Sequence, residues 1–254
     1  MLKRLPWFLL PVCLCFLAVS CATTDMAERE RQAKASRRLG EGYLAQGNLN
    51  AALKELLRAQ ELNADDPFLQ NDLGLAYFGK GRLDLAIVHF EKALALKADY
   101  SEALNNMGAV YVRLEEWDKA IDCSNGALEG VLYANPHLAL CNLGDAYRGK
   151  KEYGLAMDSY KKALEIQPRY LQAHKGLGLA YMETGDYSAA ISSLEKAVEC
   201  NPRYAPSYYD LGRAYAGSKY NTTKAISAFK KVVELAPESA LADEASAQIR
   251  RLQR

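Results

Sequence analysis

Apolar residues between residues 33 and 237 recur in the pattern of paired amphipathic helices. Each unit carries a Leu-Gly or Met-Gly pair, a tyrosine three residues after the glycine and an alanine twelve or thirteen residues after it. The glycines are Gly40, Gly74, Gly108, Gly144, Gly178 and Gly212, at spacings of 34, 34, 36, 34 and 34. A fixed period of this length, with helical periodicity inside it, predicts six stacked helix–turn–helix units and an all-α fold.

The small residues of each unit mark the place where its two helices cross. Glycine inside a helix is less favourable than alanine by about 0.5–1 kcal/mol, so six such glycines need a packing reason. A large residue sixteen or seventeen residues after the glycine is expected to fill the space: Leu56, Phe90, Tyr160, Leu194 and Phe229. In the third unit this position is Ser124.

The unit resembles the tetratricopeptide repeat, which implies a right-handed superhelix of six repeats over residues 33–237. Pro168, Pro202 and Pro237 each close a unit because proline cannot continue a helix. Residues 238–254 carry an apolar stripe among charged residues and are predicted to form the polar-faced helix that caps the open end of a solenoid.

Two units depart from the period of 34. The third-to-fourth step contains two extra residues within residues 126–136, and the sixth unit has one extra residue near residues 218–221. Loops tolerate insertions well, so both additions are expected to lie in connections between helices.

The first twenty residues differ from the rest of the chain. Lys3 and Arg4 precede an apolar run from Leu5 to Val19, which is broken by two prolines. A run of 15 residues is short for a membrane span and typical of a signal peptide, so residues 1–20 are predicted to be a cleaved signal. The alternative is an uncleaved N-terminal anchor.

Ala18-Val19-Ser20-Cys21 resembles the bacterial lipobox, in which the cysteine thiol receives a diacylglyceryl group. Lipidation is therefore predicted at Cys21, with residues 21–32 as the lipidated cysteine and its tether, although ordinary signal peptidase could also cut after Ser20. Several acyl chains hold a protein firmly on a membrane. By the same resemblance, Ala22 in place of aspartate favours the outer membrane.

Composition adds little to this picture. The chain of 254 residues is 50% hydrophobic with a net charge of +1, and loss of Lys3 and Arg4 with the signal would make it −1. No basic excess points to nucleic acid as a partner. Cys123, Cys141 and Cys200 remain beside Cys21 in the predicted mature chain and are interpreted as small buried apolar residues.

No catalytic constellation stands out in the sequence. His89, His137 and His174 lie in different repeats without metal-ligand spacing, and phosphate-binding or nucleophile motifs are missing. The sequence predicts no enzyme, no metal, no cofactor and no small-molecule substrate.

The predicted function therefore lies in a surface. In solenoids of this kind, positions two, five, nine and twelve of each first helix line the concave face. These positions give a partner-binding groove of Phe68, Asn71, Leu75, Phe78, Asn105, Ala109, Val112, Asp145, Arg148, Lys175, Leu179, Met182, Tyr209 and Arg213, with Cys141 beside them.

Six of these residues form an apolar stripe: Leu75, Phe78, Ala109, Val112, Leu179 and Met182. Exposed apolar patches mark protein-binding sites, but tight packing or the terminal helix could also bury the stripe. Lys175 is followed one turn later by Leu179 instead of asparagine, so a Lys–Asn carboxylate clamp is not expected.

The lipobox, six repeats and terminal helix together resemble the type IV pilus biogenesis lipoproteins called PilF, PilW or Tgl. Leu132-Tyr133-Ala134-Asn135-Pro136 looks like the Leu-Tyr-Pro element of those proteins, with two residues added. The resemblance implies a lipoprotein on the periplasmic face of the outer membrane that helps secretin subunits to localise and multimerise. The alternative is a repeat adaptor for another envelope complex, such as one that organises peptidoglycan hydrolases.

Overall fold

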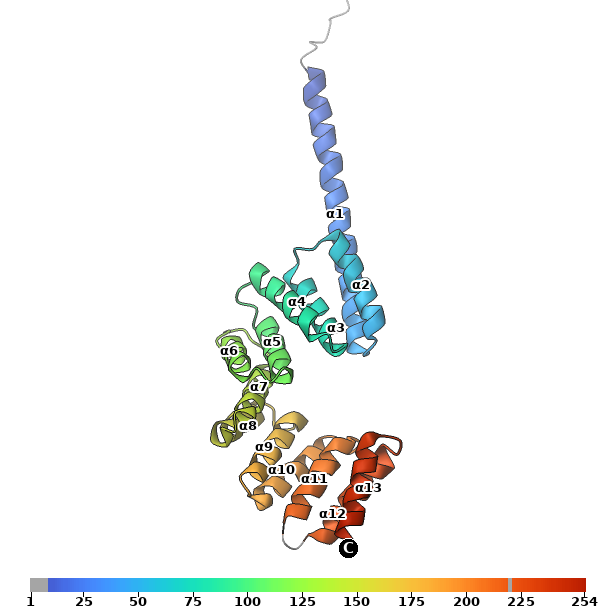
Figure 1. The fold of residues 1–254 in the computed structure, drawn as a ribbon. Helices are drawn as coiled ribbons and strands as arrows, with labels where there is room; N and C mark the ends of the chain where they lie inside the picture. Colours follow the sequence, from blue (N-terminus) through green and yellow to red (C-terminus); the bar gives the residue numbers. More distant parts are fainter. Residues whose placement is uncertain (1–8, 219–220) are drawn as a thin grey trace, which may run out of the picture. The chain divides into compact units, whose positions relative to one another are not determined.

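The computed structural model describes residues 9–218 and 221–254, with side chains from Met26 onward, and within these ranges it contains thirteen helices and no strand (Figure 1). The helices are α1 (Leu9–Ala45), α2 (Leu49–Leu62), α3 (Pro67–Gly79), α4 (Leu83–Leu96), α5 (Ser101–Arg113), α6 (Trp117–Leu128), α7 (Pro136–Gly149), α8 (Tyr153–Ile166), α9 (Leu171–Glu183), α10 (Tyr187–Cys200), α11 (Ala205–Gly217), α12 (Thr222–Leu235) and α13 (Ala240–Leu252). The predicted all-α fold is confirmed.

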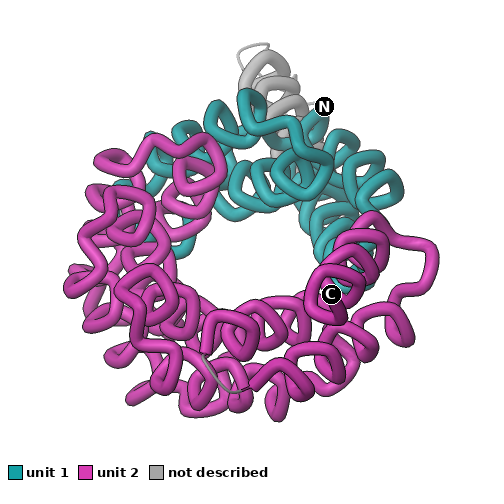
Figure 2. Tube along the Cα trace, turned by 60° about the horizontal axis from the view of Figure 1, so that its bottom comes forward, with its two compact units in different colours: residues 1–103 teal, residues 104–254 magenta. Residues whose placement is uncertain are grey.

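The chain forms two compact units, which Figure 2 colours separately. Unit 1 covers residues 1–103, where α1 packs against α2 and α3 against α4. Unit 2 covers residues 104–254, where the pairs α7–α8, α9–α10 and α11–α12 pack in the same way. Helices α8, α10 and α12 each end two residues before a proline that was predicted to close a unit.

The signature glycines lie where the two helices of a repeat cross. A Cβ atom built on Gly74 would lie 2.4 Å from the Phe90 ring, and one built on Gly144 would lie 2.5 Å from the Tyr160 ring. Both rings are buried. The glycine therefore makes room for the large side chain of the second helix, as the sequence predicted.

The third repeat is packed differently at this crossing. A Cβ atom built on Gly108 would lie 3.0 Å from the Ser124 hydroxyl, with no ring in the way. Ser124 is fully buried, and its hydroxyl has no hydrogen-bond partner in the described part of the chain. The small side chain leaves this crossing without the ring or leucine found in the other repeats.

In each of the first five repeats, the turn between the two helices has one residue in the left-handed region. Gly81 takes this conformation in the second repeat, with φ of 73°. Glu115 takes the corresponding place in the third repeat, with φ of 58°, although its Cβ makes this conformation unfavourable by about 1–2 kcal/mol. Gly81 and Glu115 are 34 residues apart, so the same position of the repeat takes this conformation whether or not it is a glycine.

Helix α1 is longer than the first repeat requires. Residues 22–32, which were expected to be a tether, are helical within α1, because its charged residues continue the helix without a breaker. Leu39 of the first repeat is 47% exposed, whereas the corresponding Leu73 of the second repeat is fully buried. Leu73 packs with Leu56 and Ala59 of the preceding helix α2, and among the described helices α1 has no such neighbour before it.

The two extra residues of the third-to-fourth step lie in the connection between α6 and α7, as expected. The backbone N–H of Tyr133 donates to the carbonyl of Gly130 at 3.0 Å and closes a turn. Val131 and Leu132 form the tip of this turn and are 98% and 94% exposed. The extra residue of the sixth unit falls near residues 219 and 220, which lie outside the described residues.

Helix α13 packs against α12 and α11. Ala242 and Ala245 are buried, and Ile249 and Leu252 pack against the same core cluster as Phe229. The predicted terminal helix thus covers the apolar end of the last repeat with one face and presents its charged residues on the other.

Among the residues with described side chains, no helix is both long and apolar enough to cross a membrane. Cys21 and the signal segment before it were assigned from sequence and lie outside the described side chains.

Candidate functional site

The predicted groove residues lie on the first helices of the repeats, and the structure gives them three degrees of exposure. Phe68 and Arg213 are exposed, whereas Asn71, Asn105 and Cys141 are buried. The remaining predicted residues are half-buried: Leu75, Phe78, Ala109, Val112, Asp145, Arg148, Lys175, Leu179, Met182 and Tyr209. The apolar stripe is therefore neither fully open nor sealed.

Polar bridges join the first helices of consecutive repeats inside each unit. The Arg37 guanidinium on α1 lies 3.2 Å from the Asp72 carboxylate on α3, 35 positions later. The Lys175 ammonium on α9 lies 3.5 Å from the Asp210 carboxylate on α11, also 35 positions later. The fifth position of one first helix thus pairs with the sixth position of the next.

The same bridge occurs across the lengthened step of unit 2. The Asn142 side-chain amide donates to the Asn105 side-chain oxygen at 3.0 Å and to the Asn105 backbone oxygen at 3.1 Å. The two residues are 37 positions apart, because the step contains two extra residues. Asn105 was predicted to line the groove, but its burial and this bond give it a bridging role.

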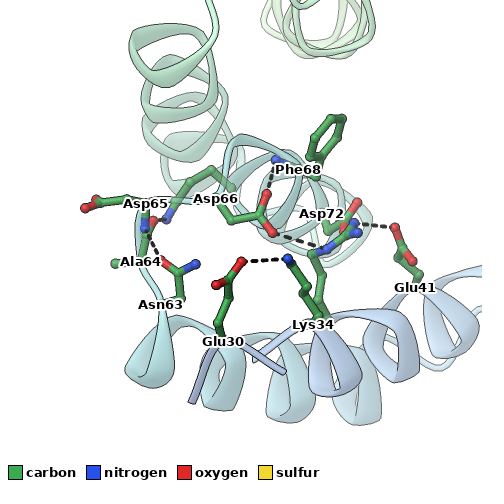
Figure 3. A network of polar contacts seen from close by, with 11 residues as sticks. Glu30, Lys34, Glu41, Asn63, Ala64, Asp65, Asp66, Phe68 and Asp72 are labelled. Carbon is green, nitrogen blue, oxygen red and sulfur yellow. Dashed lines mark hydrogen bonds and ion pairs between the residues drawn. The ribbon is translucent and has the colours of Figure 1, made fainter. Parts of the chain in front are cut away.

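In unit 1 the bridge is part of a network centred on one cation. The Arg37 guanidinium lies 2.6 Å from Glu41, 3.4 Å from Asp66 and 3.2 Å from Asp72. Figure 3 shows these three carboxylates pointing toward a common centre. Asp66 also accepts a hydrogen bond from the Phe68 backbone N–H at 2.9 Å, so it caps α3 while it holds α1.

An exposed aromatic side chain lies at the rim of this network. The Lys97 ammonium lies 5.4 Å from the centre of the Phe68 ring, and the Arg37 guanidinium lies 5.6 Å from it. The Tyr100 ring meets Phe68 edge to face at 5.4 Å. Cations at these distances from a ring are attracted to its face, so Phe68 is held in place although it is exposed.

The carboxylates around Arg37 outnumber their cation. Burial and the nearby Glu41 charge together raise the pKa of Asp72 to about 7, although Arg37 lowers it. The first-helix face of unit 1 therefore combines a half-buried cation with an excess of acid groups.

In unit 2 the bridge keeps the same order of charges, but here one aspartate has two cations. The buried Asp210 carboxylate lies 3.5 Å from Lys175 and 3.6 Å from Arg213. Burial raises the pKa of Asp210, while Lys175 and Arg213 lower it. One buried anion here serves two cations that reach toward solvent.

A second anion lies on the same face of unit 2. The Tyr160 hydroxyl donates to the Asp145 carboxylate at 2.7 Å, and Arg148 lies 3.8 Å from the same oxygen. Burial raises the pKa of Asp145, against the effects of Tyr160, Arg148 and Lys175. Helices α7 and α9 contact each other, as do α9 and α11, so these charges form one row along the first helices.

The predicted groove includes Asp145, Arg148, Lys175 and Arg213, which take part in these contacts, but does not include Asp72 and Asp210. Both aspartates occupy the sixth position of a first helix, which was not counted among the concave positions. A spacing of 35 residues between a polar fifth position and a polar sixth position would have identified them. That signal was present in the sequence.

The surroundings of His89 and Cys123 indicate that these side chains have structural roles. The Gln70 amide nitrogen donates to the Ala64 carbonyl at 2.8 Å, which leaves its oxygen to accept from His89 at 2.8 Å. Burial lowers the pKa of His89 to about 4 and raises that of Cys123 to about 11. Where side chains are described, no group of three or more His, Cys, Asp or Glu residues could hold a metal ion.

Profiles of the tetratricopeptide repeat match the chain over residues 40–115, 99–169, 178–218 and 205–239. No curated protein sequence matches it. Among solved structures, PilF of Pseudomonas aeruginosa is 21% identical with a TM-score of 0.71, and the alignment covers 87% of this chain and 99% of PilF.

Two further structures show how widely the fold is shared. PilW, described as a widely conserved type IV pilus biogenesis factor, is 20% identical with a TM-score of 0.75, covering 84% of this chain and 97% of PilW. The Cut9–Hcn1 assembly of the anaphase-promoting complex is 18% identical with a TM-score of 0.79, covering 91% of this chain and 45% of that chain. The repeat profiles together cover about three quarters of the sequence, and the chain belongs to the tetratricopeptide-repeat family.

Proposed function

We propose that the protein is an outer-membrane lipoprotein of type IV pilus biogenesis that promotes localisation and multimerisation of the pilus secretin. The observation that carries this proposal is the architecture. Six repeats and a terminal helix align with nearly the whole length of PilF and PilW. Tetratricopeptide repeats are typically scaffolds that bind proteins, which fits an assembly role.

The proposed anchor is the lipid on Cys21. The Ala18-Val19-Ser20-Cys21 sequence supports it, and α1 continues from this segment into the first repeat. A lipid would hold the scaffold at the membrane surface and so raise the local concentration of a partner that inserts there. The location on the periplasmic face is part of the same proposal.

The proposed contact is the first-helix face of the repeats. Half-buried apolar residues such as Leu75 and Phe78 lie beside exposed Phe68 in unit 1, and Leu179 and Met182 lie beside charged residues in unit 2. A face of this composition suits a helical or extended segment of a secretin.

The first experiment removes the gene from its host and examines the secretin on a gel without boiling. We expect the heat-resistant multimer to disappear while the monomer persists. Normal multimers together with normal surface pili would contradict the proposal and point to another envelope complex.

The anchor is tested by Cys21→Ala, with Cys15→Ala as the matched control in the same segment. We expect Cys21→Ala to abolish acyl labelling and to reduce secretin multimers, whereas Cys15→Ala leaves both unchanged. Acyl labelling of Cys21→Ala at the level of the unaltered protein would remove the anchor from the proposal.

The contact is tested by Leu75→Asp combined with Phe78→Asp. The control is Val88→Asp combined with Leu96→Asp, because these residues of α4 are apolar and exposed but lie on a second helix. We expect loss of secretin capture only in the first pair. Intact capture by a folded Leu75→Asp, Phe78→Asp variant would show that unit 1 does not use this face.

A further inference from the structure

One face of α1, on the side away from α2, is apolar and uncovered. Ala35 is exposed, Leu39 is 47% exposed and Gly42 is half-buried. A Cβ atom built on Gly42 would meet no atom within 4 Å, whereas one built on Gly40 would meet Leu56 of α2. The first three residues are spaced by four and three positions, so they share one face of the helix. We call these three residues the α1 edge.

The equivalent face of the second repeat is closed by a helix. Leu69, Leu73 and Ala76 lie 34 positions after the residues of the α1 edge, and all three are buried. They pack in one cluster with Leu56 and Ala59 of α2. The same contact, from a second helix to the next first helix, recurs at α6–α7, α8–α9 and α10–α11. The chain itself therefore shows what covers this face: an amphipathic helix with a leucine and an alanine three residues apart.

The first and last repeats differ in how their outer faces are treated. Helix α13 packs on α12, and its exposed residues include Asp243, Arg250 and Arg251. The end of a solenoid needs such a polar-faced cap. Among the described helices none packs on the α1 edge, and the edge itself is apolar. The first repeat thus keeps a docking face of the kind that its neighbours bury.

We propose that the α1 edge binds an amphipathic helix of a partner protein, in the place that α2 takes on α3. Leucine and alanine side chains of that helix close over Ala35, Leu39 and Gly42, and the two small residues let the helices approach closely. The contact continues the stacking interface that the repeats already use. This surface is separate from the face proposed to contact the secretin, so the inference goes beyond the proposed function and does not depend on it.

The chain's own segments do not supply this helix. The described residues before Ala33 continue α1 without a break, so they do not fold back over the α1 edge. In a second copy, the leucine and alanine of α2 are already buried, and the exposed face of α13 is charged. Two α1 edges packed about Leu39 would bring the exposed Arg38 of both copies together, which is unfavourable for like charges. The occupant is therefore a different protein.

Binding is tested with the full chain, purified in lipid nanodiscs, and a fluorescent peptide that has the sequence of residues 49–62, which form α2. A hydrocarbon staple on its polar side holds the peptide helical, because a free helix of this length is marginal in water. A control peptide has aspartate in place of the residues that correspond to Leu56 and Ala59. We expect the first peptide to bind at one saturable site and the control peptide to bind more weakly by about tenfold or more.

The site is assigned with variants of the full chain. Leu39→Asp and Ala35→Glu should each weaken binding of the α2 peptide by about tenfold or more. Leu57→Asp is the matched control, because it makes the same change at another exposed leucine of the first repeat, on α2. Since Ala35 and Leu39 are exposed, both variants should keep the melting temperature of the unaltered chain, and Ala35→Glu serves if Leu39→Asp does not.

Equal binding of the two peptides, no loss in either variant of the α1 edge, or an equal loss in Leu57→Asp would overturn the inference. Two further measurements separate the occupants. A dimer in sedimentation that Leu39→Asp dissociates would assign the α1 edge to a second copy. Binding of Cys21→Ala protein to phosphatidylethanolamine–phosphatidylglycerol vesicles that is lost with Leu39→Asp would assign it to the membrane, and either result would contradict the proposal.

Discussion

Units 1 and 2 use the same inter-repeat bridge, a cation at the fifth position and a buried aspartate at the sixth, but in different surroundings. In unit 1 three carboxylates share one cation, Arg37, whereas in unit 2 two cations share one aspartate, Asp210. The aspartate of each bridge is equally buried, because the side chains of Asp72 and Asp210 are both 10% exposed. The same repeat geometry therefore holds an excess of carboxylates around the bridge in unit 1 and an excess of cations around it in unit 2.

The largest effect is expected where Arg37, the half-buried cation shared by three carboxylates, is removed. Arg37→Met leaves Asp66 and Asp72 partly buried without their partner, which should lower the free energy of unfolding by about 3 kcal/mol. Arg38→Met is the control, because Arg38 is exposed and should change stability by less than about 0.5 kcal/mol. Urea unfolding measures both, and equal effects would show that the unit 1 network does not stabilise the fold.

The second repeat, in unit 1, and the third repeat, in unit 2, differ at their helix crossings. Gly74→Ala in unit 1 places a Cβ atom against the Phe90 ring and should be destabilising by about 1–3 kcal/mol. Gly108→Ala in unit 2 places a Cβ atom 3.0 Å from the Ser124 hydroxyl and 3.5 Å from both the Ala120 carbonyl oxygen and the Cys123 Cβ, with no ring in the way. It should be neutral or stabilising by up to about 1 kcal/mol. Thermal unfolding of the two variants decides this, and a larger loss for Gly108→Ala would contradict the packing assigned to both crossings.

The acid surplus of unit 1 should be visible in the pH dependence of stability. An aspartate whose pKa rises to about 7 on folding contributes stability that is complete below its unfolded pKa of about 4 and is lost as pH rises through 7. Asp72→Asn should therefore gain about 1–2 kcal/mol relative to the unaltered protein between pH 5 and pH 8.

The other titrating groups are the same in Asp72→Asn and in the unaltered chain, so their contributions to the pH dependence of stability cancel in the comparison. His89 works in the opposite direction, since its pKa falls to about 4 on folding and its contribution is lost as pH falls from about 6.5 to 4. Urea unfolding at the two pH values gives the difference directly. A difference that stays constant with pH would show that Asp72 titrates normally.

The smallest effect is expected at the outer cation of unit 2. Arg213 is 45% exposed, and Asp210 keeps Lys175 when Arg213 is lost. Arg213→Ala should change the free energy of unfolding by less than about 0.5 kcal/mol. A loss comparable to that of Arg37→Met would mean that Arg213 stabilises unit 2 as strongly as Arg37 stabilises unit 1, which would contradict the comparison of the two units.

Most of the fold was predictable because packing at the helix crossings requires small and large residues at fixed spacings in the sequence. The glycines, the large residues opposite them and the closing prolines recur at fixed spacing, and Ser124 was visible as an exception. The helical extension through residues 22–32 was not predicted, because a charged segment without glycine or proline fits either a helix or a tether.

The site was predictable only in part. Asp145, Arg148, Lys175 and Arg213 lie on first helices and are at least partly exposed, but Asn71 and Asn105 are buried. Periodicity within one helix tells which face a residue occupies. It does not tell how closely the neighbouring repeat approaches that face, and this distance decides whether a polar residue meets solvent or a partner.

The bridges between fifth and sixth positions also match particular repeats to each other. Arg37 meets an aspartate, Asn105 meets an asparagine and Lys175 meets an aspartate, each in the next repeat along the chain. A shuffled chain in which the fourth repeat followed the first would set Arg37 opposite Asn142 and leave its guanidinium without that aspartate. Each bridge therefore ties a repeat to one particular neighbour through complementary side chains. The loops between the repeats are free to change in length.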